Sequence, residues 1–169
     1  WLGLLGISDR DRLRASDFVF RSFLSENGLG ENRRQNSKNN RNDKVFSLHS
    51  IFGDEQPTLE DVDIHEIIIH RDGPRAMLRF DLPQYPKLPP TRWLASGFNR
   101  VQLKLMAVGL REFSISGWLA QCRLKLDVSA EGKLIRLNTR DGPVKIDLST
   151  EYLILENICA YRDERVLEG

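Results

Sequence analysis

The chain has 169 residues, a length that fits one ordinary domain with an appendage and allows a sizeable hydrophobic core. Hydrophobic residues make up 40% and charged residues 29%, and the formal net charge of +1 excludes a bulk electrostatic attraction to nucleic acid or to an anionic membrane. No apolar run approaches the roughly 20 residues that span a bilayer. Residues 1–7 are too short for a signal peptide and lack its basic region. We therefore expect a cytoplasmic protein without a membrane or nucleic-acid partner.

Residues 8–26 are expected to form a helix. Ser8 is suited to cap it, and Leu13, Phe20, Phe23 and Leu24 fall near one helical face. Because a helix this short gains most of its stability from packing, we expect it to dock on the body of the protein. The alternative is a helix that binds a partner.

Residues 31–44 contain no apolar side chain and are rich in Asn, Arg and Lys. Such a segment buries too little surface to offset the entropy of ordering it, so we interpret it as a loop or disordered linker. A nucleic-acid-binding arm is the alternative, but interleaved aromatic residues are absent. We therefore divide the chain into residues 1–50, a helix plus a polar linker, and residues 51–169, an antiparallel β domain.

From residue 62 onward the sequence reads as about eight short strands separated by turns. Asp72-Gly73 between two apolar runs is a strong hairpin signal, and Gly109 is expected to turn the chain between two later strands. The pattern predicts a mainly β fold. We expect an antiparallel meander arranged as a sandwich, a rolled sheet or a partly open barrel, with the one N-terminal helix. The expected strands span residues 62–70, 75–82, 101–107, 110–117, 122–128, 135–139, 144–148 and 152–161.

A stiff loop at residues 83–93 holds four of the seven prolines and presents Tyr85 and Trp93. Prolines restrict the loop to few conformations, which lowers the entropic cost of presenting a side chain. Two interpretations follow for Trp93. It either closes one end of the core, as large aromatic residues usually do, or acts with Tyr85 as an anchor in a protein interface.

The densest acidic stretch precedes and enters the first strand. Its members are solvated loop residues in one interpretation and a steering patch for a basic partner in the other, because an acidic cluster accelerates association with a cationic surface. The five residues of this acidic stretch are Asp54, Glu55, Glu60, Asp61 and Asp63.

No catalytic or cofactor-binding pattern stands out. His49, His65 and His70 lack a third ligand at metal spacing, and no nucleophile motif or phosphate-cradling glycine loop is present. Cys122 and Cys159 are expected to be free, buried thiols. We therefore expect a protein without a cofactor, a metal or an enzymatic activity.

Several short stretches of the sequence are similar to one known family. They include Arg71-Asp72-Gly73-Pro74, Phe80-Asp81-Leu82-Pro83, Pro89-Pro90 with Trp93, Phe98-Asn99-Arg100-Val101-Gln102-Leu103 and Gly117-Trp118, and an opening at residues 52–62. Together they resemble the immunity protein 50 family of bacterial polymorphic toxin systems over residues 52–161. The resemblance implies a mostly β fold and a non-enzymatic role, in which the protein binds and neutralises a cognate toxin domain.

Two hypotheses of function remain at this point. The first is an immunity protein that inhibits its toxin by occlusion. The second is a small-ligand-binding or hydrolytic β-barrel domain. The lack of convergent titratable residues in the sequence favours the first, because catalytic sites need such clusters.

Overall fold

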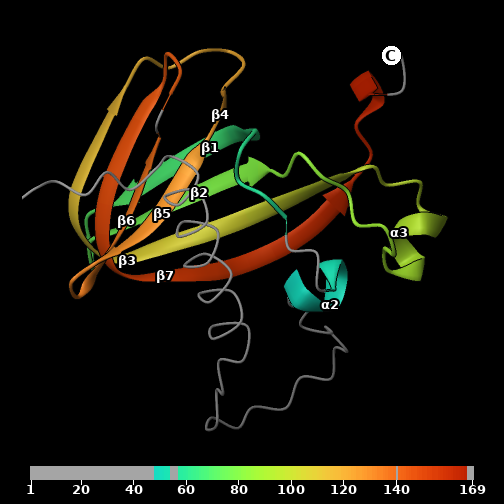
Figure 1. Ribbon diagram of the computed structural model, residues 1–169, viewed down its shortest axis with the longest axis horizontal. Helices are drawn as coiled ribbons and strands as arrows, with labels where there is room; N and C mark the ends of the chain where they lie inside the picture. Colours follow the sequence, from blue (N-terminus) through green and yellow to red (C-terminus); the bar gives the residue numbers. More distant parts are fainter. Residues whose placement is uncertain (1–47, 54–56, 140, 167–169) are drawn as a thin grey trace, which may run out of the picture.

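A computed structural model describes residues 48–53, 57–139 and 141–166 (Figure 1). The helix expected at residues 8–26 and the polar segment at 31–44 lie outside this part of the chain. So do Asp54 and Glu55 of the acidic stretch. The division of the chain at residue 50 therefore stays an expectation.

The described residues form a mainly β fold, as the alternating pattern predicted. Seven strands make one antiparallel sheet in the order β4-β1-β2-β3-β7-β6-β5. The strands are β1 (Val62–His70), β2 (Arg75–Asp81), β3 (Arg100–Ser116), β4 (Arg123–Leu124), β5 (Leu126–Glu131), β6 (Leu134–Thr139) and β7 (Lys145–Tyr161).

The sheet curls until its two edges nearly meet. β4 pairs with β1 at one edge and β5 pairs with β6 at the other, and Lys125 alone separates these two strands. The segment from β4 to β5 thus contributes one strand to each edge of the sheet. The Leu126 amide also donates a hydrogen bond of 2.9 Å to the Leu59 carbonyl. Closure of this kind leaves few unpaired backbone groups, so the protein has the partly open barrel among the three predicted architectures.

Two long strands replace four of the expected short ones. β3 and β7 each contain 17 residues and pair along most of their length (Figure 1). The sequence predicted a turn at Gly109, and this prediction is wrong. The strand continues through it, and the pairing with β7 shifts register between Leu110 and Glu112. A bulge of this kind bends a strand without ending it, which allows one strand to wrap around the barrel.

The hydrophobic core fills the inside of the curled sheet. Side chains alternate between the two faces of a strand, so every second residue from Ala76 to Phe80 in β2 and from Val101 to Ala107 in β3 points inward and is apolar. Burying a side chain such as Leu or Phe stabilises a fold by roughly 1.5–3 kcal/mol. The inward residues from the long strands include Ala76, Leu78, Phe80, Val101, Leu103, Leu105, Ala107, Ile146, Leu148 and Leu153.

The first hairpin forms where the sequence predicted it. His70 pairs with Arg75, and Gly73 in the connecting loop has a φ of 61°. A residue with a Cβ atom resists this left-handed conformation, whereas glycine adopts it readily. The Asp72-Gly73 turn signal is therefore confirmed.

The remaining elements are short. The helix α2 (Leu48–Phe52) contributes Leu48 and Ile51 to the core, α3 (Thr91–Ala95) follows the prolines, and the 3-10 turn η1 (Glu164–Val166) follows β7. Within the ranges that the structure describes, no helix has the length and apolar character needed to cross a membrane.

Candidate functional site

The proline loop delivers Trp93 into the core. Pro90 precedes the short helix α3, and the Trp93 amide donates a hydrogen bond of 2.8 Å to the Pro90 carbonyl. The Trp93 side chain is only 6% exposed, and its ring centroid lies 6.4 Å from that of Tyr85. Tyr85 is half-buried and packs against the same core. The core position of Trp93 agrees with the first of its two interpretations, and a role of either ring in a partner interface stays a prediction.

The described acidic residues do not form a purely negative patch. Lys125 Nζ lies 2.6 Å from Glu60 Oε1, and Arg123 Nη1 lies 3.4 Å from Asp61 Oδ2. Both cations come from the segment that closes the barrel. Asp63, the last member of the stretch, is half-buried and faces a neighbouring pocket.

This pocket has a volume of about 520 Å³ and is the candidate functional site. It lies where the first two strands, the start of β3, the loop after β3 and the C-terminal segment come together. Segments that are far apart in the sequence therefore supply its walls. The lining residues are Asp63, Ile64, His65, Asp81, Arg100, Trp118, Leu119, Ala120, Gln121, Arg123, Asp163 and Arg165.

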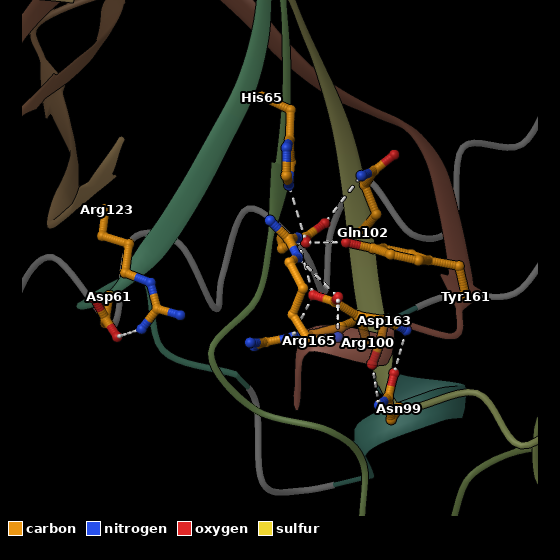
Figure 2. A network of polar contacts seen from close by, with 10 residues as sticks. Asp61, His65, Asn99, Arg100, Gln102, Arg123, Tyr161, Asp163 and Arg165 are labelled. Carbon is orange, nitrogen blue, oxygen red and sulfur yellow. Dashed lines mark hydrogen bonds and ion pairs between the residues drawn. The ribbon is translucent and has the colours of Figure 1, made fainter. Parts of the chain in front are cut away.

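A buried carboxylate, that of Asp81, is the centre of the first polar cluster in the pocket wall. Gln102 Nε2 donates a hydrogen bond of 2.9 Å to Asp81 Oδ1, and the Tyr161 hydroxyl donates one to Oδ2. His65 Nε2 lies 2.9 Å from the same Oδ2 atom. Figure 2 shows the side chains of His65, Gln102 and Tyr161 converging from three strands. Burial, together with the hydrogen bond to Asp81, raises the pKa of Tyr161, so its hydroxyl stays protonated as a donor.

A second buried carboxylate, that of Asp163, lies just after β7. Arg165 binds it in a two-pronged arrangement, with Nε 2.9 Å from Oδ1 and Nη2 3.0 Å from Oδ2. These hydrogen bonds from Arg165 hold the pKa of Asp163 below its usual range. Asn99 fixes the backbone of the same residue. Its Nδ2 donates to the Asp163 carbonyl at 2.9 Å, and its Oδ1 accepts from the Asp163 amide at 2.7 Å (Figure 2).

Arg100 stands between these two clusters. Its side chain is 21% exposed, and its Nε lies 3.7 Å from Asp163 Oδ2, which is an ion-pair distance and too long for a hydrogen bond. Nε itself is buried and has no hydrogen-bond partner in the described structure. A guanidinium with an unsatisfied buried donor thus faces the pocket.

The chemistry of the pocket is that of polar recognition. Three arginines and three aspartates line it, so its formal charge is balanced when His65 is neutral. None of the described lining residues is Ser, Thr or Cys, the usual side-chain nucleophiles. The described ranges also hold no group of three or more His, Cys, Asp or Glu side chains placed to bind a metal ion. The arrangement is equipped to hold a polar or charged group by hydrogen bonds.

The two cysteines differ in environment. Both are free thiols; Cys122 is buried as expected, whereas Cys159 is exposed on the outer face of β7, where the sequence had predicted burial. The pairing of Cys159 with Gln102 explains this position, because Gln102 points away from the core. Of the other histidines, His70 is exposed at the end of β1 and the side chain of His49 lies outside the description.

Sequence reasoning named Asp63 as a site residue but missed most of the pocket. Three of the lining residues it missed, Arg100, Asp163 and Arg165, come from the start of β3 and from the tail after β7. Tyr161, which donates to the lining residue Asp81, ends β7, and only the fold brings these residues together. The sequence held one signal that pointed to these residues, the resemblance to a known family. Asp81, Asn99, Arg100, Gln102 and Trp118 all belong to the short stretches through which the chain resembles a known family.

The family model described as immunity protein 50 matches residues 45–161, more than half of the chain. Among solved structures, the chain is similar to an uncharacterized protein from Neisseria gonorrhoeae, with 14% sequence identity and a TM-score of 0.41, covering 58% of this chain and 92% of that one. At that level the likeness carries no argument about function. No curated protein matches the chain significantly.

Proposed function

The chain belongs to the immunity protein 50 family, and we propose that it binds and neutralises a cognate toxin domain of a bacterial polymorphic toxin system in the cytoplasm. The family match over residues 45–161 is the observation that carries the proposal. Neutralisation is by occlusion, so the protein contributes a binding surface and no chemistry of its own.

The proposed binding surface includes the mouth of the pocket and the described members of the acidic stretch beside it, Glu60, Asp61 and Asp63. Trp118 and Leu119 are 50% and 47% exposed at the pocket. A half-exposed tryptophan next to buried polar groups is the kind of residue that contributes most of the binding energy in protein interfaces. The site therefore combines an apolar anchor with polar groups that fix orientation.

The acidic stretch is proposed to accelerate the encounter with the toxin. Glu60 and Asp61 are exposed to solvent, although each forms an ion pair, Glu60 with Lys125 and Asp61 with Arg123. Charges at the rim of an interface mainly set the association rate and its salt dependence, whereas buried anchors set dissociation. A toxin with a basic cleft would be drawn to this side of the molecule.

A ligand-binding or hydrolytic role is the second candidate, and one observation bears on it. His65 and Asp81 lie 2.9 Å apart in the wall of the pocket, a spacing that suits a base and the residue that orients it. Without a side-chain nucleophile among the described lining residues, this pair would have to activate a bound water molecule. The family membership favours the first candidate.

The experiment that tests the proposal is a binding measurement with the toxin domain encoded next to this chain. We expect a one-to-one complex in calorimetry and size-exclusion chromatography. A second preparation carries Asn or Gln at all five acidic positions, namely 54, 55, 60, 61 and 63. We expect that variant to associate more slowly and with a weaker salt dependence, while its dissociation rate changes little. Absence of a complex with the unmodified chain would overturn the proposal.

A further inference from the structure

We propose that the pocket is the receptor for a carboxylate side chain of the toxin, which Arg100 binds through its guanidinium group; this inference rests on the proposed function. Some hydrogen-bonding groups of the pocket are already paired within the protein, and one buried donor is not, so a ligand must suit that donor.

The two buried acceptors in the pocket are occupied. Asp81 receives hydrogen bonds from Gln102 and Tyr161 and lies against His65, and both carboxylate oxygens of Asp163 are bound by Arg165. A cationic group that entered the pocket would have to displace these partners. Asp81 and Asp163 are therefore poorly placed to bind a lysine or arginine of the toxin.

One arginine donor of the pocket, in contrast, lacks a hydrogen-bond partner in the described structure. Arg100 Nε is buried without a hydrogen-bond partner, and its one ion pair in the described structure is with Asp163 at 3.7 Å, which Arg165 already holds. Leaving a buried, charged donor unsatisfied costs free energy that an incoming acceptor recovers. The planar guanidinium presents a fixed fork of N–H groups that matches the two oxygens of a carboxylate.

Charge favours a monoanion over a phosphate. Asp63 also lines the pocket, and no hydrogen bond or ion pair of its carboxylate is seen among the described residues. A doubly charged phosphate would meet this carboxylate with twice the repulsion of an aspartate or glutamate side chain. The apolar rim of Trp118 and Leu119 would cover the aliphatic part of such a side chain.

The direct test observes the Arg100 Nε–Hε resonance by NMR in the full chain. The probe is sodium acetate, with sodium chloride at matched ionic strength as the control for screening. We expect the Arg100 resonance to shift saturably with acetate and to stay unchanged with chloride. An equal response to both salts, or no response, overturns the inference. A tighter site for sodium phosphate than for acetate overturns the choice of a carboxylate.

Variants extend the test to the complex with the toxin domain. We expect Arg100→Gln to raise the dissociation rate at least about tenfold, because the guanidinium would contact the toxin in a partly buried pair. Arg71→Gln, at a side chain that is 98% exposed in the first hairpin, is the matched control and should leave the rate unchanged. Circular dichroism of both variants checks that they are folded.

The outcomes separate the two proposals. If the unmodified chain binds the toxin and folded Arg100→Gln binds equally well, the carboxylate inference is wrong and the immunity function stands. If the unmodified chain does not bind the toxin, the proposed function fails, whatever the response of Arg100 to acetate.

Discussion

Individual residues at the pocket hold distant parts of the chain together through charge. Asp163 is the clearest case, because its buried carboxylate lies 3.7 Å from Arg100 at the start of β3. Its neighbour Arg165 binds the same carboxylate, and Asn99 fixes its backbone. Since the hydrogen bonds from Arg165 lower the pKa of Asp163 in the folded protein, the same group must also make folding depend on pH.

We expect Asp163→Asn to weaken the acid sensitivity of the fold. In the unfolded chain this carboxyl takes up a proton near its ordinary pKa of about 3.9, whereas in the folded chain it stays ionised to lower pH. The stabilisation is therefore present above that value and is lost as the pH falls through the lower, folded pKa. Urea unfolding between pH 6 and pH 3 should show a smaller loss of stability for the variant than for the unmodified chain. If the free energy of unfolding falls equally with pH in the variant and in the unmodified chain, this explanation of the ion pair is wrong.

Two glycines with similar backbone conformations provide a matched test of local geometry. Gly73 and Gly117 have φ values of 61° and 72°. A Cβ atom at residue 73 would meet no neighbouring atom within 4 Å, but at residue 117 it would lie 2.0 Å from the Pro143 carbonyl oxygen. We expect Gly73→Ala to cost about 1 kcal/mol of stability, from the left-handed conformation alone.

Gly117→Ala should cost clearly more, about 2 kcal/mol or above, because the backbone at residue 143 must also move. Thermal unfolding of the two variants measures the difference. Equal costs would mean that the contact with residue 143 does not constrain the loop that carries Trp118.

At the scale of elements, the short helix α3 shows why sequence alone left a choice open. The prolines predicted that the loop holds an aromatic side chain in a defined position. Alternation and composition do not tell whether that position faces the core or the solvent. The fold decides it, since Trp93 points into the core and the next residue, Leu94, is 62% exposed.

This neighbouring pair gives a sharp prediction. Trp93→Ala should destabilise the protein by about 3–5 kcal/mol, the usual cost of removing a buried tryptophan side chain. Leu94→Ala changes an exposed position of the same helix and should shift stability by less than about 0.5 kcal/mol. Chemical denaturation of both variants is the measurement. A small effect at Trp93 would mean that this end of the core collapses around the cavity.

The strands themselves were more predictable than their lengths. Alternating apolar residues located β1, β2 and β6 closely, and the Asp72-Gly73 signal placed the first hairpin correctly. Gly109 was wrongly predicted as a turn, because a glycine with a positive φ inside a strand looks the same in sequence as one that ends a strand. The pairing of β3 with β7 joins residues between 29 and 61 positions apart, which local patterns do not encode.

The whole molecule is a nearly closed sheet whose polar pocket depends on that long-range pairing. Arg100 begins β3, Tyr161 ends β7, and their pairing brings the tail with Asp163 beside the first two strands. The candidate site could therefore be predicted only in part. Asp63 was identified from the acidic stretch, whereas the arginines became a cluster only when the ends of β3 and β7 met.

The central claim is that this chain protects a bacterium from the toxin encoded beside it. The most direct measurement is survival of cells that express the toxin domain with or without the chain. The account predicts that the unmodified chain and Leu94→Ala restore growth, while Trp93→Ala, which loses core packing, restores it poorly. Equal death with and without a folded, expressed chain would contradict the claim.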